Sequence, residues 1–169
     1  MKPLTFAAEI ELEGAKIYRR LADNSSSSEI KALFNFLADA EQEHYKLFIG
    51  MKKNSNIELI DDSTLVQETS EILKKVEKKS CGEGFFQSDI YLDILEVERK
   101  AADFYERKAL TSINSDLREI YGKLAAEERR HQYLIESLIR FVNNPEICLE
   151  EGFKELLTYI PLGKDEVIS

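Results

Sequence analysis

The sequence predicts an all-α protein, a four-helix bundle built from two copies of one helical hairpin. Pro and Gly are scarce, with three and seven among 169 residues, and this favours helix. Apolar residues recur at helical spacing through four long segments, the pattern of amphipathic helices. Residues 9–48 align with 96–135 without gaps, and thirteen of the forty pairs are identical. Unrelated sequences would match at roughly one position in sixteen, so the chain contains an internal repeat with an offset of 87 residues.

The first hairpin is predicted over residues 4–53. One helix covers 4–23 and ends where Asp23-Asn24 and a run of serines interrupt the apolar pattern, because serine side chains compete for backbone hydrogen bonds. A second helix covers 29–53, with Ser27 or Ser28 as its N-cap. The connection is short, so we expect the two helices to be antiparallel neighbours.

The second hairpin is predicted over residues 87–142, after a crossover over 54–86 that holds one short helix beginning at Ser63 or Thr64. Its two helices cover 87–111 and 115–142, and Ser115 is the expected N-cap of the latter. A short C-terminal helix is predicted over 145–160. We expect the whole chain, 1–169, to form a single domain, because its length is typical of one.

Composition excludes several classes of partner. The net charge of −9 argues against nucleic acid or an anionic membrane surface as a partner. No apolar signal core and no run of membrane-spanning length occurs, so a cytoplasmic location is expected by default. Cys81 and Cys148 lie far apart without a C-x-x-C motif, so we predict neither a zinc ribbon nor a role for either cysteine.

The chemistry is predicted to reside in six residues that recur at the offset of 87. Two short motifs each place a carboxylate and an imidazole three residues apart, on one face of a helix and one turn from each other. A lone glutamate in the preceding helix of each hairpin occupies a position that the apolar stripe would otherwise fill. The six residues are Glu11, Glu41, His44, Glu98, Glu128 and His131.

These six residues predict a site for two metal ions. An ionised carboxylate buried alone costs several kcal/mol, so four that face one another in a bundle need positive charge between them. Two divalent cations supply it, and oxygen with imidazole ligands suits iron or manganese, with zinc as an alternative. The competing interpretation is a set of solvated surface acids. The chain has only two histidines, both at equivalent repeat positions beside a glutamate, and this favours the metal site.

Residues near these six have simpler expected roles. Tyr18 and Tyr105 lie two turns from Glu11 and Glu98, where their hydroxyls can reach a ligand carboxylate on a facing helix; the equally weighted alternative is an ordinary interior tyrosine. Five further acids are out of phase with the apolar stripes and are expected to be solvated. They are Glu9, Glu13, Glu43, Glu96 and Glu127.

The repeated Glu-x6-Tyr and Glu-x-x-His motifs resemble the di-iron motif of the ferritin-like superfamily, and most of all that of the rubrerythrins, over residues 4 to about 142. The resemblance implies a ferritin-like four-helix bundle in which Glu41 and Glu128 bridge two iron ions. Glu11 and Glu98 would be terminal ligands, and each histidine of the two motifs would bind one ion.

The sequence departs twice from the rubrerythrin pattern, and it also lacks one feature of bacterioferritins. The four cysteines of the rubredoxin domain that supplies electrons in rubrerythrins are absent. Leu95 occupies the place of a further glutamate that rubrerythrins tend to carry one turn before Glu98. Gln42 stands where bacterioferritins carry a methionine that ligates haem, so no haem is predicted.

The predicted function is a non-haem di-iron oxidoreductase that reacts with hydrogen peroxide or dioxygen, a rubrerythrin-like peroxidase. It would take electrons from an external donor protein. Ferrous oxidation for iron handling requires the same six ligands and stays open as an alternative. A third alternative is a non-catalytic bundle that the metal ions stabilise. A homodimer is compatible with the resemblance.

Overall fold

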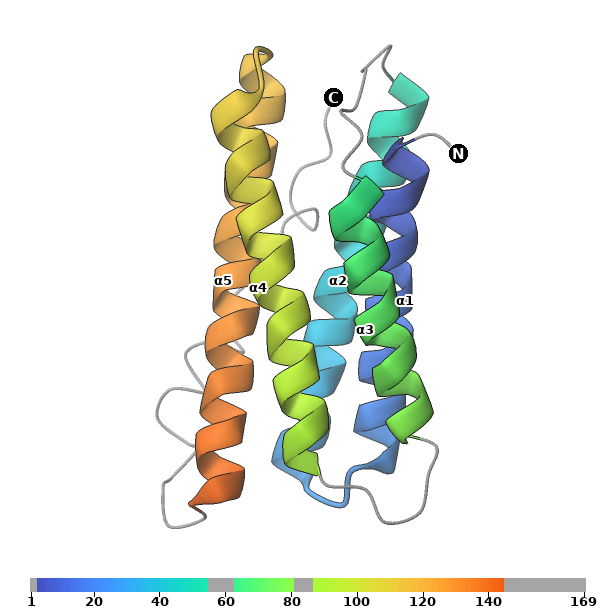
Figure 1. Ribbon diagram of the computed structural model, residues 1–169, viewed down its shortest axis with the longest axis vertical. Helices are drawn as coiled ribbons and strands as arrows, with labels where there is room; N and C mark the ends of the chain where they lie inside the picture. Colours follow the sequence, from blue (N-terminus) through green and yellow to red (C-terminus); the bar gives the residue numbers. More distant parts are fainter. Residues whose placement is uncertain (1–2, 55–62, 81–86, 145–169) are drawn as a thin grey trace. The chain divides into compact units, whose positions relative to one another are not determined.

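The computed structural model describes residues 3–54, 63–80 and 87–144 (Figure 1). Within these ranges the chain forms helices and no strand, which confirms the all-α prediction. The four long helices begin and end within two residues of their predicted bounds, and the crossover helix begins at Ser63 as expected. The C-terminal helix predicted over 145–160, Cys81 and Cys148 lie outside the described residues. The helices are α1 (Pro3–Asn24), α2 (Ser28–Asn54), α3 (Ser63–Ser80), α4 (Gln87–Thr111) and α5 (Ser115–Asn143).

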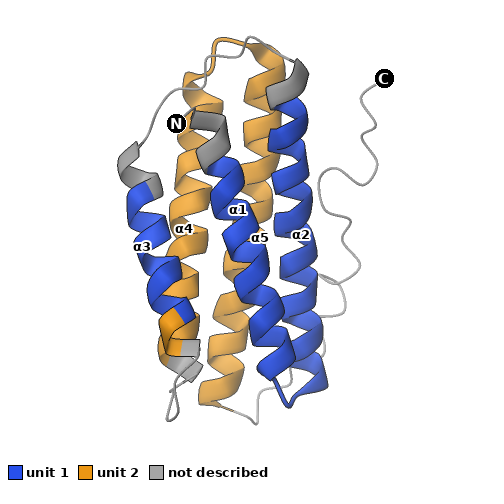
Figure 2. Ribbon diagram, turned by 90° about the vertical axis from the view of Figure 1, so that its right-hand side faces the viewer, with its two compact units in different colours: residues 1–77, 160–169 blue, residues 78–159 orange. Residues whose placement is uncertain are grey.

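The described residues fall into two compact units (Figure 2). The first contains α1, α2 and α3 as far as Glu77; the second begins at Lys78 and contains α4 and α5. Helix α1 packs against α2, and α4 packs against α5. Each copy of the sequence repeat is therefore one helical hairpin, as the short connections predict. The prediction of a single domain over 1–169 stays a prediction.

Each hairpin buries the apolar stripe that its sequence predicts. In the first hairpin the fully buried side chains include Leu33, Phe34 and Leu37 of α2. In the second hairpin the corresponding helix α5 buries Leu124 at the position equivalent to Leu37. Burial of one large apolar side chain stabilises the fold by about 1.5–3 kcal/mol, so these stripes hold each pair of helices together.

Equivalent residues of the repeat cap α2 and α5, and for α5 the cap is not the residue that was predicted. The Ser27 hydroxyl accepts a hydrogen bond from the backbone N–H of Ile30 at 3.3 Å, so Ser27 caps α2. The prediction that Ser115 caps α5 is wrong, because Asn114 is the N-cap. Its side chain accepts hydrogen bonds from the backbone N–H groups of Asp116 and Leu117 at 2.9 and 3.1 Å. Asn114 is the repeat equivalent of Ser27, since 114 minus 27 is 87.

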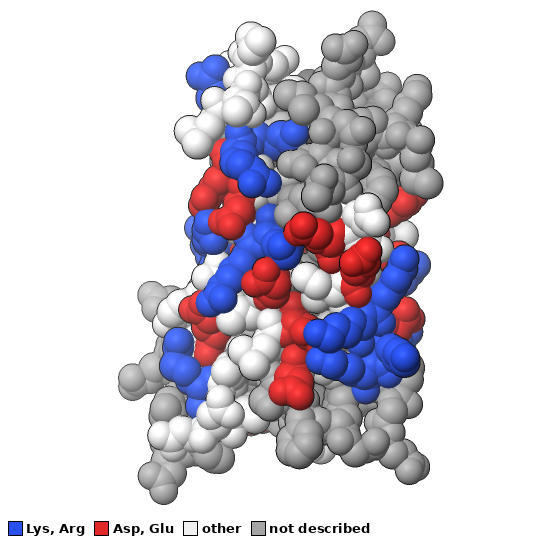
Figure 3. Space-filling view, in the orientation of Figure 1, with Lys and Arg blue, Asp and Glu red and all other residues white. Residues whose placement is uncertain are grey.

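Charged side chains of both signs alternate on the surface. Arg20 of α1 donates to Glu77 of α3 at 3.1 Å, and Arg129 of α5 donates to Glu106 of α4 at 3.0 Å. On the face shown in Figure 3, groups of lysine and arginine lie beside groups of aspartate and glutamate. Among the described residues no helix is long and apolar enough to cross a membrane.

Candidate metal centre

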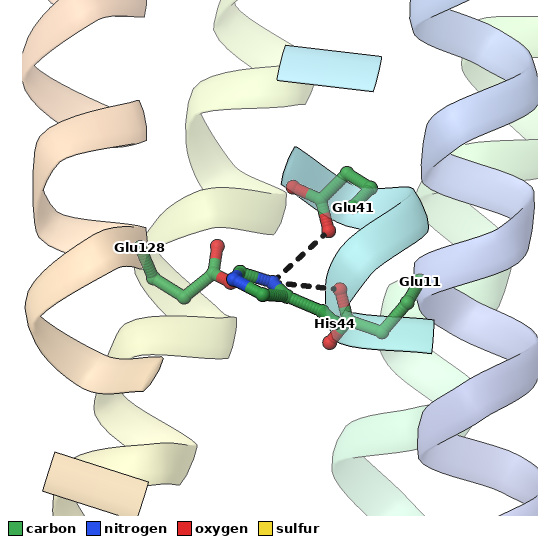
Figure 4. A group of neighbouring side chains, drawn as sticks. All are labelled: Glu11, Glu41, His44 and Glu128. Carbon is green, nitrogen blue, oxygen red and sulfur yellow. Dashed lines mark ion pairs between the residues drawn. The ribbon is translucent and has the colours of Figure 1, made fainter. Parts of the chain in front are cut away.

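The first hairpin brings three of the predicted ligands together in its interior. Glu11 projects from α1, and Glu41 and His44 project from successive turns of α2 (Figure 4). The Nδ1 atom of His44 lies 3.5 Å from Glu11 Oε2 and 3.7 Å from Glu41 Oε2. Their exposed fractions are 4% for Glu11, 5% for Glu41 and 0% for His44, so all three groups are removed from water.

The second hairpin repeats this arrangement with its own three residues. Glu98 projects from α4, and Glu128 and His131 project from α5. The Nδ1 atom of His131 lies 3.4 Å from Glu98 Oε2 and 3.3 Å from Glu128 Oε2. All three side chains are buried, with at most 3% exposed. Each hairpin thus carries one buried group of two carboxylates and one imidazole, which we call a Glu-Glu-His triad.

The geometry of both triads fits a metal ion better than it fits hydrogen bonding. Separations of 3.3–3.7 Å between the histidine Nδ1 and the carboxylate oxygens exceed the usual length of an N–H···O hydrogen bond. Two ligand atoms about 2.1 Å from one ion lie roughly 3 Å apart when they are at right angles and roughly 4 Å apart when they are opposite. In each triad the donor atoms all lie within 4.8 Å of one another, so each can surround one ion.

Burial also raises the pKa values of two carboxyl groups of the triads. The pKa of Glu11 is raised from 4.5 to about 8, chiefly by loss of hydration and also by the neighbouring Glu41 carboxylate, while His44 opposes the shift. The pKa of Glu98 is likewise raised to about 8, chiefly by loss of hydration; His131 opposes the shift and Glu128 contributes to it. A bound divalent cation reverses this penalty because it favours the ionised carboxylates.

Gly14 lies directly beside the first triad. A Cβ atom added at Gly14 would lie 3.7 Å from Glu41 Cγ and 4.0 Å from Glu41 Cδ. These separations are ordinary van der Waals contacts, and the equivalent position of the second hairpin is Ala101. The space next to the Glu41 side chain therefore accepts one methyl group, whereas a longer side chain would enter the volume that this glutamate occupies.

The variant Gly14→Ala is expected to increase the free energy of unfolding by up to about 1 kcal/mol, because alanine is the better helix former and meets no clash. Gly14→Leu is expected to displace Glu41 and to lower metal affinity. Urea unfolding and zinc titration of both variants measure these effects. A Gly14→Leu protein with unchanged zinc affinity would contradict the contact between this position and Glu41.

Two of the five neighbouring acids are exposed as predicted, namely Glu9 and Glu96. Glu13 and Glu43 are only partly exposed. The prediction that Glu127 is solvated is wrong, since only 2% of it is exposed. Its helical phase differs from that of Glu128, but the buried arc of α5 is wide enough to include both.

Leu95, which departs from the rubrerythrin pattern, is part of the apolar core. Leu95 of α4 is buried, with 5% exposed, so an apolar side chain fills the place where a further carboxylate would otherwise lie. Glu96, its neighbour, is half exposed and pairs with Lys100 at 3.5 Å. The second hairpin thus offers two carboxylates to its triad, as the first does.

The two tyrosines are buried and stack on aromatic rings of the facing helix. Tyr18 stacks on Phe34 with ring centroids 6.0 Å apart, and Tyr105 stacks on Tyr121 at 6.2 Å. Phe34 and Tyr121 are repeat equivalents, since 121 minus 34 is 87. The reach of the tyrosine hydroxyls toward a ligand carboxylate stays a prediction.

Comparison with known proteins bears on the fold and on the triads alike. The family model described as Rubrerythrin matches residues 2–139. No curated protein and no solved structure matches the chain significantly. The matched segment spans α1 through most of α5 and includes both Glu-Glu-His triads. The chain therefore belongs to the rubrerythrin family, within the ferritin-like superfamily of helical bundles.

Proposed function

We propose that the protein is a non-haem di-iron oxidoreductase that reduces hydrogen peroxide or dioxygen. The observation that carries this proposal is the duplicated, buried Glu-Glu-His triad in a chain of the rubrerythrin family. Each triad offers the ligands of one ion, and we propose that the two triads together form one dinuclear centre. Its ligands would be Glu11, Glu41, His44, Glu98, Glu128 and His131, with Glu41 and Glu128 as bridges.

The chain's own residues would hold and insulate this centre. Four carboxylates neutralise the charge of two divalent ions, and two neutral imidazoles complete their coordination. Bound iron would supply the redox chemistry by cycling between its ferrous and ferric states. The buried position of all six side chains excludes bulk water, which strengthens every electrostatic interaction at the centre. Tyr18 and Tyr105 are proposed to orient ligand carboxylates through their hydroxyls.

Electrons would come from a separate donor protein. The chain contains only Cys81 and Cys148, fewer than the four thiolates of a rubredoxin-type iron site, so the donor of the multidomain rubrerythrins is not encoded in it. Ferrous oxidation for iron handling is the second candidate, because it needs the same ligands. The symmetry of the two triads favours neither reaction over the other.

Reconstitution with ferrous iron under anaerobic conditions tests the proposal. We expect two irons per chain, measured by metal analysis, and an oxo-bridged ferric absorption spectrum after addition of peroxide or air. A faster reaction with peroxide supports the peroxidase, and a faster reaction with air supports ferrous oxidation. A centre that binds two ions but shows no change with either oxidant would contradict both and indicate a bundle that the metal merely stabilises.

A further inference from the structure

The connection between α4 and α5 presents two large apolar side chains to solvent. Leu110, in the last turn of α4, is 85% exposed, and Ile113, in the connection itself, is 97% exposed. They lie three residues apart, and they are more exposed than any other large apolar side chain among the described residues. We call residues 107–118 the α4–α5 turn.

The other copy of the repeat has polar side chains at these two positions. Subtracting 87 from each number leads to Asp23 and Ser26 in the connection between α1 and α2, and both are exposed. The same turn can therefore be built with side chains that water hydrates well. The apolar pair of the second hairpin is not required by the fold, and adjacent exposed apolar side chains indicate an interaction surface.

Hydrogen bonds hold the α4–α5 turn in one conformation. The hydroxyl and the backbone N–H of Ser112 both donate to the Lys108 carbonyl, at 2.6 and 3.0 Å. The Arg118 guanidinium donates to the Ser112 carbonyl at 3.2 Å, and the Thr111 hydroxyl donates to the Arg107 carbonyl at 2.8 Å. A partner that binds here therefore orders little additional backbone, and this lowers the entropic cost of binding.

The α4–α5 turn is also more basic than its counterpart. It contains three cations and one acid, whereas residues 20–31 contain two of each, and the whole chain has a net charge of −9. Arg107 and Arg118 are exposed. The one acid, Asp116, lies in the first turn of α5, where the helix dipole partly offsets its charge. A positive region on an acidic protein attracts a partner with an acidic surface.

Aromatic rings in contact lie between this turn and the triad of the second hairpin. The Phe104 and Tyr105 ring centroids are 5.3 Å apart, and those of Tyr105 and Tyr121 are 6.2 Å apart. Tyr105 is seven residues from Glu98 and five from Leu110, or about 10 and 7.5 Å along the helix.

The two tyrosines of this cluster extend in opposite directions. Side chains in a helix lean toward its N-terminus, so Tyr105 of α4 leans toward Glu98. Tyr121 belongs to α5, which begins at Ser115 beside the turn, so it leans toward the turn. Electron transfer through protein slows steeply with distance, and π-systems in contact provide a better path than saturated side chains. The stacked pair therefore connects the turn with the second triad.

We propose that the α4–α5 turn is the docking site of the external electron donor, an acidic one-electron carrier protein with an apolar surface around its redox group. This inference rests on the proposed function, which requires such a donor. In each encounter the carrier loses one electron, and one ferric ion becomes ferrous. Two encounters supply the two electrons that, with two protons, convert one hydrogen peroxide molecule to two water molecules.

The observations favour a carrier protein over the other occupants of an exposed apolar turn. Electron-transfer encounters between proteins are small and short-lived, and this suits a patch of two apolar side chains with a charged rim. A stable dimer of the chain needs a larger interface, and two copies with a net charge of −9 repel each other. A membrane surface would give no reason for the aromatic cluster behind the turn.

The variant Leu110→Asp/Ile113→Ser, which copies the first hairpin, tests the docking site by stopped-flow spectroscopy. The probes are two acidic carriers, reduced rubredoxin and reduced flavodoxin, mixed with the ferric protein. We expect the variant to be reduced about tenfold more slowly by at least one carrier, because it loses the apolar contacts. Dithionite needs no docking and should reduce both proteins equally. The rate with the carrier should fall as salt is added.

The matched control is Leu92→Thr, which removes an exposed apolar side chain elsewhere on α4 and copies Thr5 of the first hairpin. It should react with the carrier as the unaltered protein does. Equal rates for the unaltered protein and Leu110→Asp/Ile113→Ser would overturn the docking site. So would equal slowing by Leu92→Thr, since the effect would then follow apolar surface in general.

A binding measurement separates the docking site from the proposed function. The zinc-loaded protein, labelled with ¹⁵N, is titrated with each oxidised carrier, and amide signals of residues 107–118 are expected to shift. If neither carrier shifts them, the proposal is wrong. It is also wrong if the variant instead loses binding to anionic vesicles, or loses a dimer seen by sedimentation. An iron-loaded protein that is inert to peroxide and air would refute the proposed function, while the titration would still decide whether the turn binds an acidic carrier.

Discussion

Simultaneous replacement of Glu41 and Glu128 by alanine is expected to abolish the binding of two iron ions per chain while the helices persist. These two residues are the proposed bridges, so their loss removes ligands from both ions at once. Both side chains are buried, with 5% and 1% exposed, so bulk water has little access to replace the missing carboxylate ligands. Metal analysis after anaerobic reconstitution measures the loss, and circular dichroism checks the helical content.

The single variants and two control positions sharpen this test. If Glu41 and Glu128 each bridge the two ions, either single substitution should weaken the binding of both ions rather than of one. Glu9 and Glu96 are exposed glutamates on α1 and α4, close in sequence to Glu11 and Glu98, and their replacement by alanine should leave two irons bound. An iron content below one per chain in the unaltered protein, and unchanged in the double variant, would eliminate the site and leave only a helical bundle.

The pH dependence of stability is expected to reverse its sign when metal is bound. In the metal-free protein burial raises the pKa values of Glu11 and Glu98 from 4.5 to about 8. Between these values the folded state binds more protons than the unfolded state, so the free energy of unfolding falls as pH rises. Each pKa unit corresponds to about 1.4 kcal/mol, and the two residues together account for several kcal/mol between pH 4.5 and pH 8.

Bound metal acts in the opposite direction. It requires ionised carboxylates, so protons compete with it and its contribution to stability grows as pH rises. Urea unfolding at pH 6 and pH 8 measures both cases, with a chelator in one series and saturating zinc in the other. The chelated protein should be more stable at pH 6, and the zinc-loaded protein should be more stable at pH 8.

The variant Glu11→Gln/Glu98→Gln serves as the control for this reversal. Glutamine has nearly the same shape and does not titrate, so the metal-free slope between pH 6 and pH 8 should flatten. If this slope is unchanged in the glutamine variant, the two carboxyl groups are not its source. If the chelated protein instead gains stability toward pH 8, the direction of the pKa shifts is wrong.

Local pattern alone determined the helices and the burial of the six predicted ligands. Helical periodicity is a property of a short segment, so the bounds of the four long helices follow from it to within two residues. The repeat then distinguishes functional from ordinary acids, because Glu11 and Glu98 interrupt the same apolar stripe in two copies. Both are buried, with 4% and 2% exposed. The joining of the two triads into one centre stays a prediction.

Only the backbone geometry decided which of two adjacent residues is the N-cap of α5. Asn114 and Ser115 are both good N-cap residues, and propensity does not separate them. The extended conformation at Asn114, with φ of −72° and ψ of 125°, directs its side chain toward the backbone N–H groups of the first turn. The repeat contained this information, because Asn114 corresponds to Ser27, but a single local window did not.

The burial of Glu127 was decided by tertiary structure alone. Helical phase places it about 100° from Glu128 around α5. This direction lies outside the apolar stripe, where a charged residue is expected to be solvated. The width of the buried arc depends on which helices pack around α5, and no local pattern records that. The sequence by itself therefore determined the hairpins and the triads. Only packing decided that Glu127 is buried as well, because burial is a property of the neighbours that a side chain meets.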